Sequence, residues 1–247
     1  MIRTIHHQAA TGGTIISKCL AAMHNVWLLS EINPFAQVPL QYAPTDLVSQ
    51  YLARYEHDVE FRLRYFSAQL NLLVARAQQM DFALILRDHS HSDFFSSDRC
   101  NRSLLAALES LGSTASSIVT VRDPVDSFVS CRMNGWLELI GNSFEEYCAR
   151  MIRFLDQYGS MPLFMFEEFC ATPDEVLKRM CAELQVSFNP GFRELFPLIQ
   201  LTGDSGRRSS VIALPGRRPL SDQDLKEIAS SLSYRILCNR LGYVQVA

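Results

Sequence analysis

The first 20 residues constrain the fold of this 247-residue chain more than any other stretch. A short apolar segment around Ile2 and Ile5 leads into a turn of small residues, Ala9-Ala10-Thr11-Gly12-Gly13-Thr14, and a run without helix breakers follows. This order predicts a β-strand, a tight loop and a helix. Because the first N–H groups of a helix lack intrahelical partners and its dipole is positive at that end, the loop favours an anion such as phosphate.

The residue types in this loop suit an anion site. Gly12 and Gly13 let the backbone approach an anion without a Cβ in the way, and Thr14 could cap the helix and donate its hydroxyl. The full pattern Gly-x-x-x-x-Gly-Lys-Ser/Thr is absent. A Gly-Gly turn before a helix is also a common plain connection, so the loop alone leaves both interpretations open.

Composition predicts a single globular domain spanning residues 1–247, with 48% hydrophobic and 20% charged residues and no dividing linker. The net charge of −3 argues against general nucleic-acid binding. Seven scattered cysteines without a Cys-x-x-Cys pair indicate a reducing compartment. Since we find neither a signal peptide nor a run of about 18 apolar residues, we expect a cytoplasmic protein without a membrane span.

Short apolar runs alternate with helical patterns along the chain. After the first strand, further strands are expected at 26–29, 82–86, 116–121 and 163–166, and helices at 45–80 (as two), 101–111, 125–133, 143–158, 173–184 and 225–241. This alternation predicts an α/β fold with a central, mostly parallel sheet of about five strands and helices on both faces. Thr172 is the expected cap of the helix that starts at Pro173.

Polar residues follow two of the expected strands. Glu31 and Asn33 come after the second strand, and Arg87-Asp88-His89-Ser90-His91-Ser92-Asp93 ends the third. Residues at the carboxyl ends of parallel strands face the ligand crevice, so Glu31 and Asn33 are candidate substrate-side groups, with a solvated loop as the alternative.

The two histidines after the third strand are candidate general bases, because neutral imidazole accepts protons near neutral pH. Asp88, His89, His91 and Asp93 also suggest a metal site. Their spacing of two differs from the i, i+4 spacing of a helical zinc motif, so we predict a base and no metal.

Two further sites follow from basic residues. Arg122-Asp123-Pro124 ends the fourth strand, with Asp123 as the expected helix cap, and Ser130 lies about two helical turns beyond Arg122. Arg122 and Ser130 can therefore converge on one anion. The polar stretch 202–218 carries Arg207 and Arg208 between glycines and serines, and it either folds over a polyanion or remains a solvated loop.

Together these motifs resemble the sulfotransferases that use 3′-phosphoadenosine 5′-phosphosulfate (PAPS). The loop 9–14 is similar to their 5′-phosphosulfate loop, usually Pro-Lys/Arg-Ser-Gly-Thr-Thr. Arg122-Asp123-Pro124 with Ser130 resembles their 3′-phosphate motif, the most specific match. Arg87-Asp88-His89 resembles the Lys-Thr-His whose histidine is the general base, and the stretch around Arg207 resembles the Arg-Lys-Gly loop that covers the nucleotide.

The resemblance implies a P-loop-like sulfotransferase domain that moves a sulfuryl group from PAPS to a hydroxyl or amine. It implies His89 as the base, with His91 as the alternative and Arg87 beside them. The implied donor-binding residues are Thr11, Gly12, Gly13, Thr14, Ile15, Arg122, Ser130, Arg207 and Arg208. We expect a small-molecule or carbohydrate acceptor, and the prediction allows a homodimer.

The chain departs from the family at Ala10, which occupies the place of the loop Lys or Arg. Loss of that cation can cost on the order of 3 kcal/mol in the transition state. Arg87, His6 or His7 could supply the charge instead. Two alternatives stay open: a phosphotransferase on a related scaffold, and a nucleotide-binding protein without catalysis.

Overall fold

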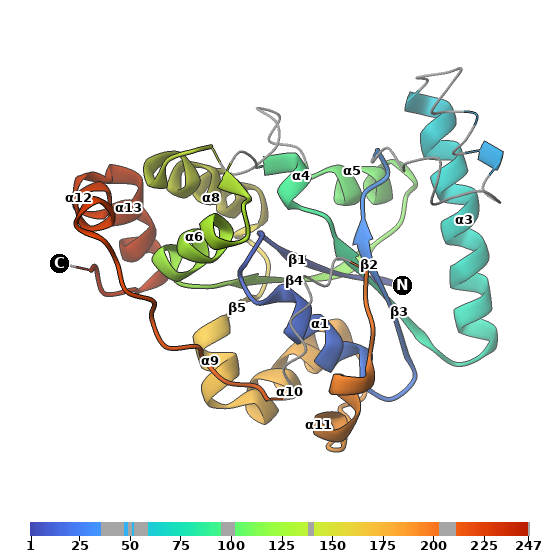
Figure 1. The fold of residues 1–247 in the computed structure, drawn as a ribbon. Coiled ribbons are helices and arrows are strands. Elements are labelled where there is room, and N and C mark those ends of the chain that lie inside the picture. Colours follow the sequence, from blue (N-terminus) through green and yellow to red (C-terminus); the bar gives the residue numbers. More distant parts are fainter. Residues whose placement is uncertain are drawn as a thin grey trace.

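The structure is a computed structural model that describes residues 1–35, 47–48, 51, 59–94, 102–137, 141–202 and 211–246. Its five described strands are β1 (Ile2–His7), β2 (Val26–Ile32), β3 (Ala83–Asp88), β4 (Ala115–Val121) and β5 (Leu163–Met165). They form one parallel sheet in the order β2-β3-β1-β4-β5 (Figure 1). The predicted α/β fold with a central parallel sheet is confirmed, and all five strands end at the same edge.

Helices cover both faces of the sheet (Figure 1). One apolar cluster joins the sheet to α3 (Val59–Gln79), α4 (His91–Phe94), α5 (Ser103–Ser110), α6 (Pro124–Met133), α8 (Phe144–Tyr158), α12 (Asp222–Ser230) and α13 (Leu232–Leu241). The other joins it to α1 (Gly13–Ala21), α9 (Phe166–Ala171), α10 (Pro173–Leu184), α11 (Phe192–Leu195) and the short 3₁₀ turn Phe196–Leu198.

The strands divide their side chains between these two clusters. Leu84 and Leu86 of β3 belong to the first cluster and Ile85 to the second, as the period-two geometry of a strand requires. Because apolar side chains lie on both faces, the expected strands appear as continuous apolar runs in the sequence.

Several boundaries differ from the sequence prediction. β2 continues to Ile32, and α9 starts at Phe166, where the fifth strand was expected to end. The predicted C-terminal helix is two helices, because Ser231 adopts an extended backbone and its hydroxyl accepts a hydrogen bond from Tyr234 N of α13. Of the two helices expected within 45–80, α3 is described, whereas most of the stretch before it lies outside the described residues.

Two predicted helix caps have different outcomes. Asp123 caps α6, and its carboxylate accepts hydrogen bonds from Val125 N and Asp126 N. Thr172 is the N-cap residue of α10, as predicted, but its side chain makes no capping hydrogen bond, because its hydroxyl donates to the Glu168 carbonyl at 3.4 Å instead. Within the described ranges, no helix combines the length and apolarity that a membrane crossing needs.

Candidate active site

The loop after the central strand β1 places the start of α1 at the carboxyl edge of the sheet (Figure 1). Gly12, with φ of 82°, is the residue before the helix, and no side chain caps this end, so the prediction that Thr14 is the cap is wrong. The N–H groups of Gly13, Thr14 and Ile15 lie in the first turn, where a helix supplies no carbonyl partner. This helix start therefore has the geometry that binds anions.

The two glycines are needed for packing as well as for an open approach. A Cβ on Gly12 would lie 2.3 Å from the ring of Phe166, and a Cβ on Gly13 would lie 2.2 Å from Nε2 of His7. Both rings are buried, so they have little room to move. Packing against Phe166 and His7 therefore requires glycine at both positions.

The predicted loop residues differ in what their side chains do. The Thr11 hydroxyl donates to the Gln8 carbonyl at 2.7 Å and so stabilises the turn. Ile15 packs against the second apolar cluster. The Gln8 side chain is fully buried, and its amide has no hydrogen-bond partner among the described residues. Buried amides are nearly always paired, so this loop has hydrogen-bonding capacity left over.

Arg87, the second-last residue of β3, brings a fixed cation to the same loop. Its Nε donates to His7 Nε2 at 2.7 Å and its Nη1 to Ser30 Oγ at 2.8 Å. Its Nη2 lies 3.3 Å from Thr14 Oγ1 and 3.1 Å from Glu31 Oε1. The side chain is only 5% exposed, and these four partners hold the guanidinium in place next to the start of α1.

Of the three candidate replacements for the missing loop cation, only Arg87 reaches the helix start as a charge. Burial first, and then Arg87 itself, holds the pKa of His7 well below its usual range, so His7 is neutral. His6 is fully buried, and its Nδ1 pairs with Asp88 Oδ2 at 2.7 Å. The same Asp88 oxygen accepts hydrogen bonds from Ser90 Oγ and Tyr158 Oη.

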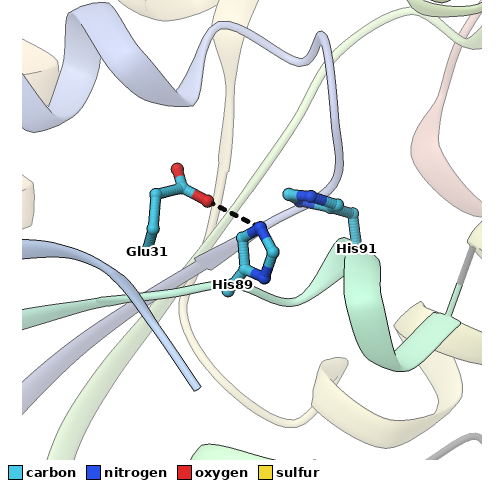
Figure 2. Close-up of side chains that lie close together, drawn as sticks. All are labelled: Glu31, His89 and His91. Atoms are coloured by element: carbon cyan, nitrogen blue, oxygen red, sulfur yellow. Dashed lines mark ion pairs between the residues drawn. The ribbon is translucent and has the colours of Figure 1, made fainter. Parts of the chain in front are cut away.

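His89 lies just past the end of β3, and Glu31 holds its ring. Glu31 Oε2 is 3.0 Å from His89 Nε2 (Figure 2). If Nε2 carries the proton in this pair, the lone pair of the neutral ring is on Nδ1. The carboxylate that faces this ring therefore comes from the neighbouring strand β2.

The backbone of Glu31 explains how this carboxylate reaches the site. Its φ is 61°, in the left-handed region that non-glycine residues rarely occupy, and the register of β2 against β3 shifts between Leu29 and Ile32. The irregularity turns the side chain toward Arg87 and His89. Strain of this kind, about 1–3 kcal/mol, tends to persist where a site needs it.

His91, the first residue of α4, stands beside His89 with a ring-centroid distance of 3.8 Å. Burial first, and then the neighbouring His89 and Arg87, lowers the pKa of His91 to about 3, so the ring is neutral. Ligand atoms of Glu31, His89 and His91 all lie within 4.8 Å of one another, and Figure 2 shows the three side chains facing one another.

The acidic members of the metal set considered from the sequence have other roles. Asp93 accepts hydrogen bonds from Ser103 N and Ser103 Oγ at the start of α5, and Asp88 binds the buried His6. Asn33 donates to Ser92 Oγ at 2.7 Å and so ties the end of β2 to α4. The four-residue set Asp88, His89, His91 and Asp93 is therefore not assembled.

Arg122 directly follows β4 and lies against the loop after β1. Its Nη1 is 3.4 Å from the Ala10 carbonyl oxygen, and its guanidinium carbon lies 5.3 Å from the centre of the Phe166 ring. Its Nη2 is 4.0 Å from Asp126 Oδ2, and its buried Nε has no partner in the described part of the chain. Phe166 thus packs between Arg122 and Gly12.

The other residues that were predicted to bind the nucleotide make fewer described contacts. Ser130 lies half-buried on α6. Its carbonyl accepts a hydrogen bond from the Asn134 side chain, and among the described residues no hydrogen bond joins its side chain to Arg122. Arg207 and Arg208 lie outside the described residues. The stretch that contains them follows Thr202, whose hydroxyl donates to the Ser30 carbonyl at 2.8 Å.

Two residues of this region had no assigned site role in the sequence analysis. The sequence predicted only that Phe166 belongs to a strand, and no sequence pattern near it predicts its contact with Gly12. Arg217 donates from Nη2 to Asp123 Oδ2 at 2.7 Å and from Nε to Asp126 Oδ1 at 3.2 Å, beside Arg122. Arg217 lies in a Gly-Arg-Arg-Pro stretch, and the sequence gives no indication that it pairs with the distant Asp123 and Asp126.

No family model and no curated protein sequence matches this chain. Among solved structures it is similar to the sulfotransferase domain from the curacin biosynthetic pathway, with a TM-score of 0.56, 14% identity and coverage of 99% of this chain and 98% of that one. The sulfotransferase domain of the Synechococcus PCC 7002 olefin synthase gives a TM-score of 0.55, 16% identity and coverage of 99% and 95%.

A mouse sulfotransferase, SULT7A1, complexed with PAP, gives a TM-score of 0.51 at 11% identity, covering 96% of this chain and 88% of that one. At such identities the likeness concerns the fold. The likeness extends over nearly the whole length of this chain, and the chain therefore has the sulfotransferase fold.

Proposed function

We propose that this protein is a PAPS-dependent sulfotransferase, which transfers a sulfuryl group from the nucleotide to an acceptor hydroxyl or amine. The observation that carries the proposal is the position of Arg87, whose guanidinium lies between the start of α1 and the Glu31–His89 pair. A fixed cation, free helix N–H groups and an imidazole meet there, and a sulfuryl transfer needs all three.

The donor would be held by the two loops that follow β1 and β4. The first-turn N–H groups of α1 and the Thr14 hydroxyl suit the 5′-phosphosulfate, and Arg122 with Ser130 suits the 3′-phosphate. The unpartnered Nε of Arg122 supports this fit, because a buried guanidinium nitrogen is rarely left without an acceptor. Arg207 and Arg208 are proposed to cover the nucleotide.

His89 is proposed to take the acceptor proton on its free ring nitrogen. The acceptor oxygen or nitrogen then forms a bond to sulfur, while the bond from sulfur to the bridging phosphate oxygen breaks and its electron pair stays on the phosphate. Arg87 stabilises the negative charge that develops there, in place of the loop cation absent at Ala10. Glu31 keeps the imidazole oriented and stabilises its positive charge.

The acceptor is proposed to be a small molecule or a carbohydrate. His89 and Glu31 are 28% and 19% exposed, so a polar acceptor can reach the base. The proposal includes no nucleic-acid partner, because the chain carries a net charge of −3.

The test combines binding with a reaction that needs no known acceptor. Calorimetry should show that 3′,5′-adenosine bisphosphate binds more tightly than ATP with magnesium. Slow hydrolysis of PAPS, with water as acceptor, should fall roughly 10²–10⁴-fold in His89→Asn, the usual contribution of a general base, while bisphosphate affinity stays nearly constant.

Three results would change the assignment. Tighter binding of ATP with magnesium would favour a phosphotransferase. Bisphosphate binding without any PAPS turnover, in the presence of a mixed acceptor panel, would favour a non-catalytic nucleotide-binding protein. If His91→Asn abolishes turnover and His89→Asn does not, the base is His91.

A further inference from the structure

We propose that Glu31, His89 and His91 form a three-ligand site for a divalent transition metal of the zinc class, and that the bound metal switches the enzyme off. The metal site itself stands on the geometry of these three residues. The inhibitory effect rests on the proposed function, because it needs His89 to be the base.

The ligand atoms are already gathered. One carboxylate oxygen and two ring nitrogens lie within 4.8 Å of one another, and they come from the ends of the neighbouring strands β2 and β3 and the start of α4 (Figure 2). Ligand bonds of about 2.0–2.2 Å in a tetrahedron separate the donor atoms by roughly 3.3–3.6 Å, so small side-chain rotations would complete the site. The Glu31–His89 contact is already shorter, at 3.0 Å.

The surroundings orient the carboxylate. Arg87 Nη2 binds Glu31 Oε1 and leaves Oε2 directed at His89. A second partner of this kind is typical of ligating carboxylates in metal sites. The positive φ of Glu31 also favours a ligand-binding role, since strained backbone conformations often persist at residues that hold a ligand.

The ligand chemistry limits the kind of metal. A metal binds imidazole through the lone pair of a ring nitrogen, which the neutral side chain offers. Two imidazoles and one carboxylate suit zinc, cobalt or nickel, whereas magnesium and calcium prefer an all-oxygen set. The partial exposure of His89 and Glu31 leaves room for water as a fourth ligand.

A filled site would be incompatible with the proton transfer proposed above. The metal would replace the Glu31–His89 hydrogen bond, fix the His89 ring through one nitrogen and place a double positive charge beside it. A ring in that state is a poor base, so bound zinc would inhibit the same site that carries the reaction.

The first measurement follows metal binding without any nucleotide. Protein freed of metal by chelation is titrated with Co²⁺, and the visible absorption of a tetrahedral cobalt site is recorded before Zn²⁺ is added to displace it. We expect one equivalent to bind. Glu31→Gln and His91→Asn should each weaken binding by more than the roughly 10–100-fold that loss of an outer partner costs. His24→Asn, which removes an exposed histidine, is the matched control and should bind like the wild type.

Equal cobalt affinity in the wild type, Glu31→Gln and His91→Asn would overturn the site, and so would the absence of saturable binding. Thermal unfolding of each metal-free variant shows whether it folds. The second measurement is PAPS hydrolysis with and without Zn²⁺, where inhibition that a chelator reverses is expected. Cobalt binding together with zinc-insensitive hydrolysis would overturn the inhibitory part. Cobalt binding without any hydrolysis in metal-free buffer would support the site and count against the proposed sulfotransferase activity instead.

Discussion

Arg87 Nη2 lies 3.3 Å from Thr14 Oγ1, although 73 residues separate them in the sequence. Thr14 belongs to the first turn of α1, and Arg87 comes from the neighbouring strand β3. A strand next to β1 therefore brings a cation to the start of α1. Because His7 Nε2 and Ser30 Oγ hold the same guanidinium, its charge is fixed before any ligand arrives.

The first prediction concerns this cation. Arg87→Gln removes the charge and keeps a polar side chain, and PAPS hydrolysis should fall by roughly 10²–10³-fold, the usual effect of losing one preorganised group that stabilises transition-state charge. Affinity for 3′,5′-adenosine bisphosphate should change much less, because that product lacks the transferred group. Steady-state kinetics and calorimetry measure the two effects.

Arg179→Gln is the control, since Arg179 pairs with Glu168 on the exposed surface of α10. It should leave both measurements unchanged. If Arg87→Gln hydrolyses PAPS at the wild-type rate, another group supplies the charge.

The second prediction concerns the 3′-phosphate. Arg122→Ala should weaken binding of the bisphosphate by roughly 2–3 kcal/mol, the scale of a charge-assisted hydrogen bond lost at a partly buried anion. AMP lacks the 3′-phosphate, so it should bind to the wild type and the variant alike. An equal loss for AMP and the bisphosphate would make Arg122 a structural residue, which its contacts with Ala10 and Phe166 would then explain.

The sequence predicted those parts of the site that are built from neighbouring residues in one continuous segment. An apolar strand followed by Gly12, Gly13 and a helix, and an apolar strand followed by Arg122 and a capped helix, each lie within one continuous stretch of sequence, 2–21 and 115–133. Parallel strands then bring such segments to one edge, so Arg87 and His89 could be assigned to the crevice before the fold was known. Some predicted strand ends agree with the structure and the others differ from it by at most three residues, because the end of a strand depends on its partner strand.

Pairings between distant segments could not be predicted. Glu31 was a candidate substrate-side residue, yet its contact with His89 depends on the register shift between β2 and β3 and on a positive φ that no sequence pattern marks for glutamate. The role of Phe166 is similar, because it depends on the approach of α9 to the loop after β1. The proposed roles of Arg207 and Arg208 remain predictions.

The third prediction concerns stability and pH at the start of α12. Asp224 closes a capping box with Ser221, and Arg132 pairs with its carboxylate. The hydrogen bond from Arg132 first, and those from Ser221 after it, hold the pKa of Asp224 well below its usual range. Asp224→Asn should lower the free energy of unfolding by about 1–2 kcal/mol near neutral pH, the sum of a cap and a partly exposed ion pair.

The sign of the pH dependence follows from the depressed pKa. In the unfolded chain Asp224 titrates at about 3.9, and in the folded chain it titrates lower, so its contribution is complete above the unfolded pKa and is lost as the pH falls toward the folded one. Urea unfolding should therefore show a smaller gap between wild type and Asp224→Asn at about pH 3 than at about pH 7. Asp222→Asn, in the same first turn, should cost only a few tenths of a kcal/mol. A gap that stays constant with pH would show that the carboxylate charge is not what stabilises this end.

The fourth prediction separates the two roles of Gly12. Gly12 and Gly135 both have positive φ, 82° and 72°, but a Cβ on Gly12 would meet the Phe166 ring at 2.3 Å, whereas a Cβ on Gly135 would meet nothing within 4 Å. Gly135→Ala should therefore cost only the left-handed backbone penalty of about 1–2 kcal/mol. Gly12→Ala should cost about 1–3 kcal/mol more, the usual range for overpacking a filled space.

Urea unfolding of the two variants gives the difference directly. Because Phe166 is buried and Arg122 lies over its ring, displacement of that ring should also move Arg122. Gly12→Ala should then bind 3′,5′-adenosine bisphosphate more weakly than Gly135→Ala does, and the loss should be larger for the bisphosphate than for AMP. Equal stability of the two variants would mean that Phe166 moves aside at no cost, and the proposed coupling between the loop after β1 and Arg122 would then be wrong.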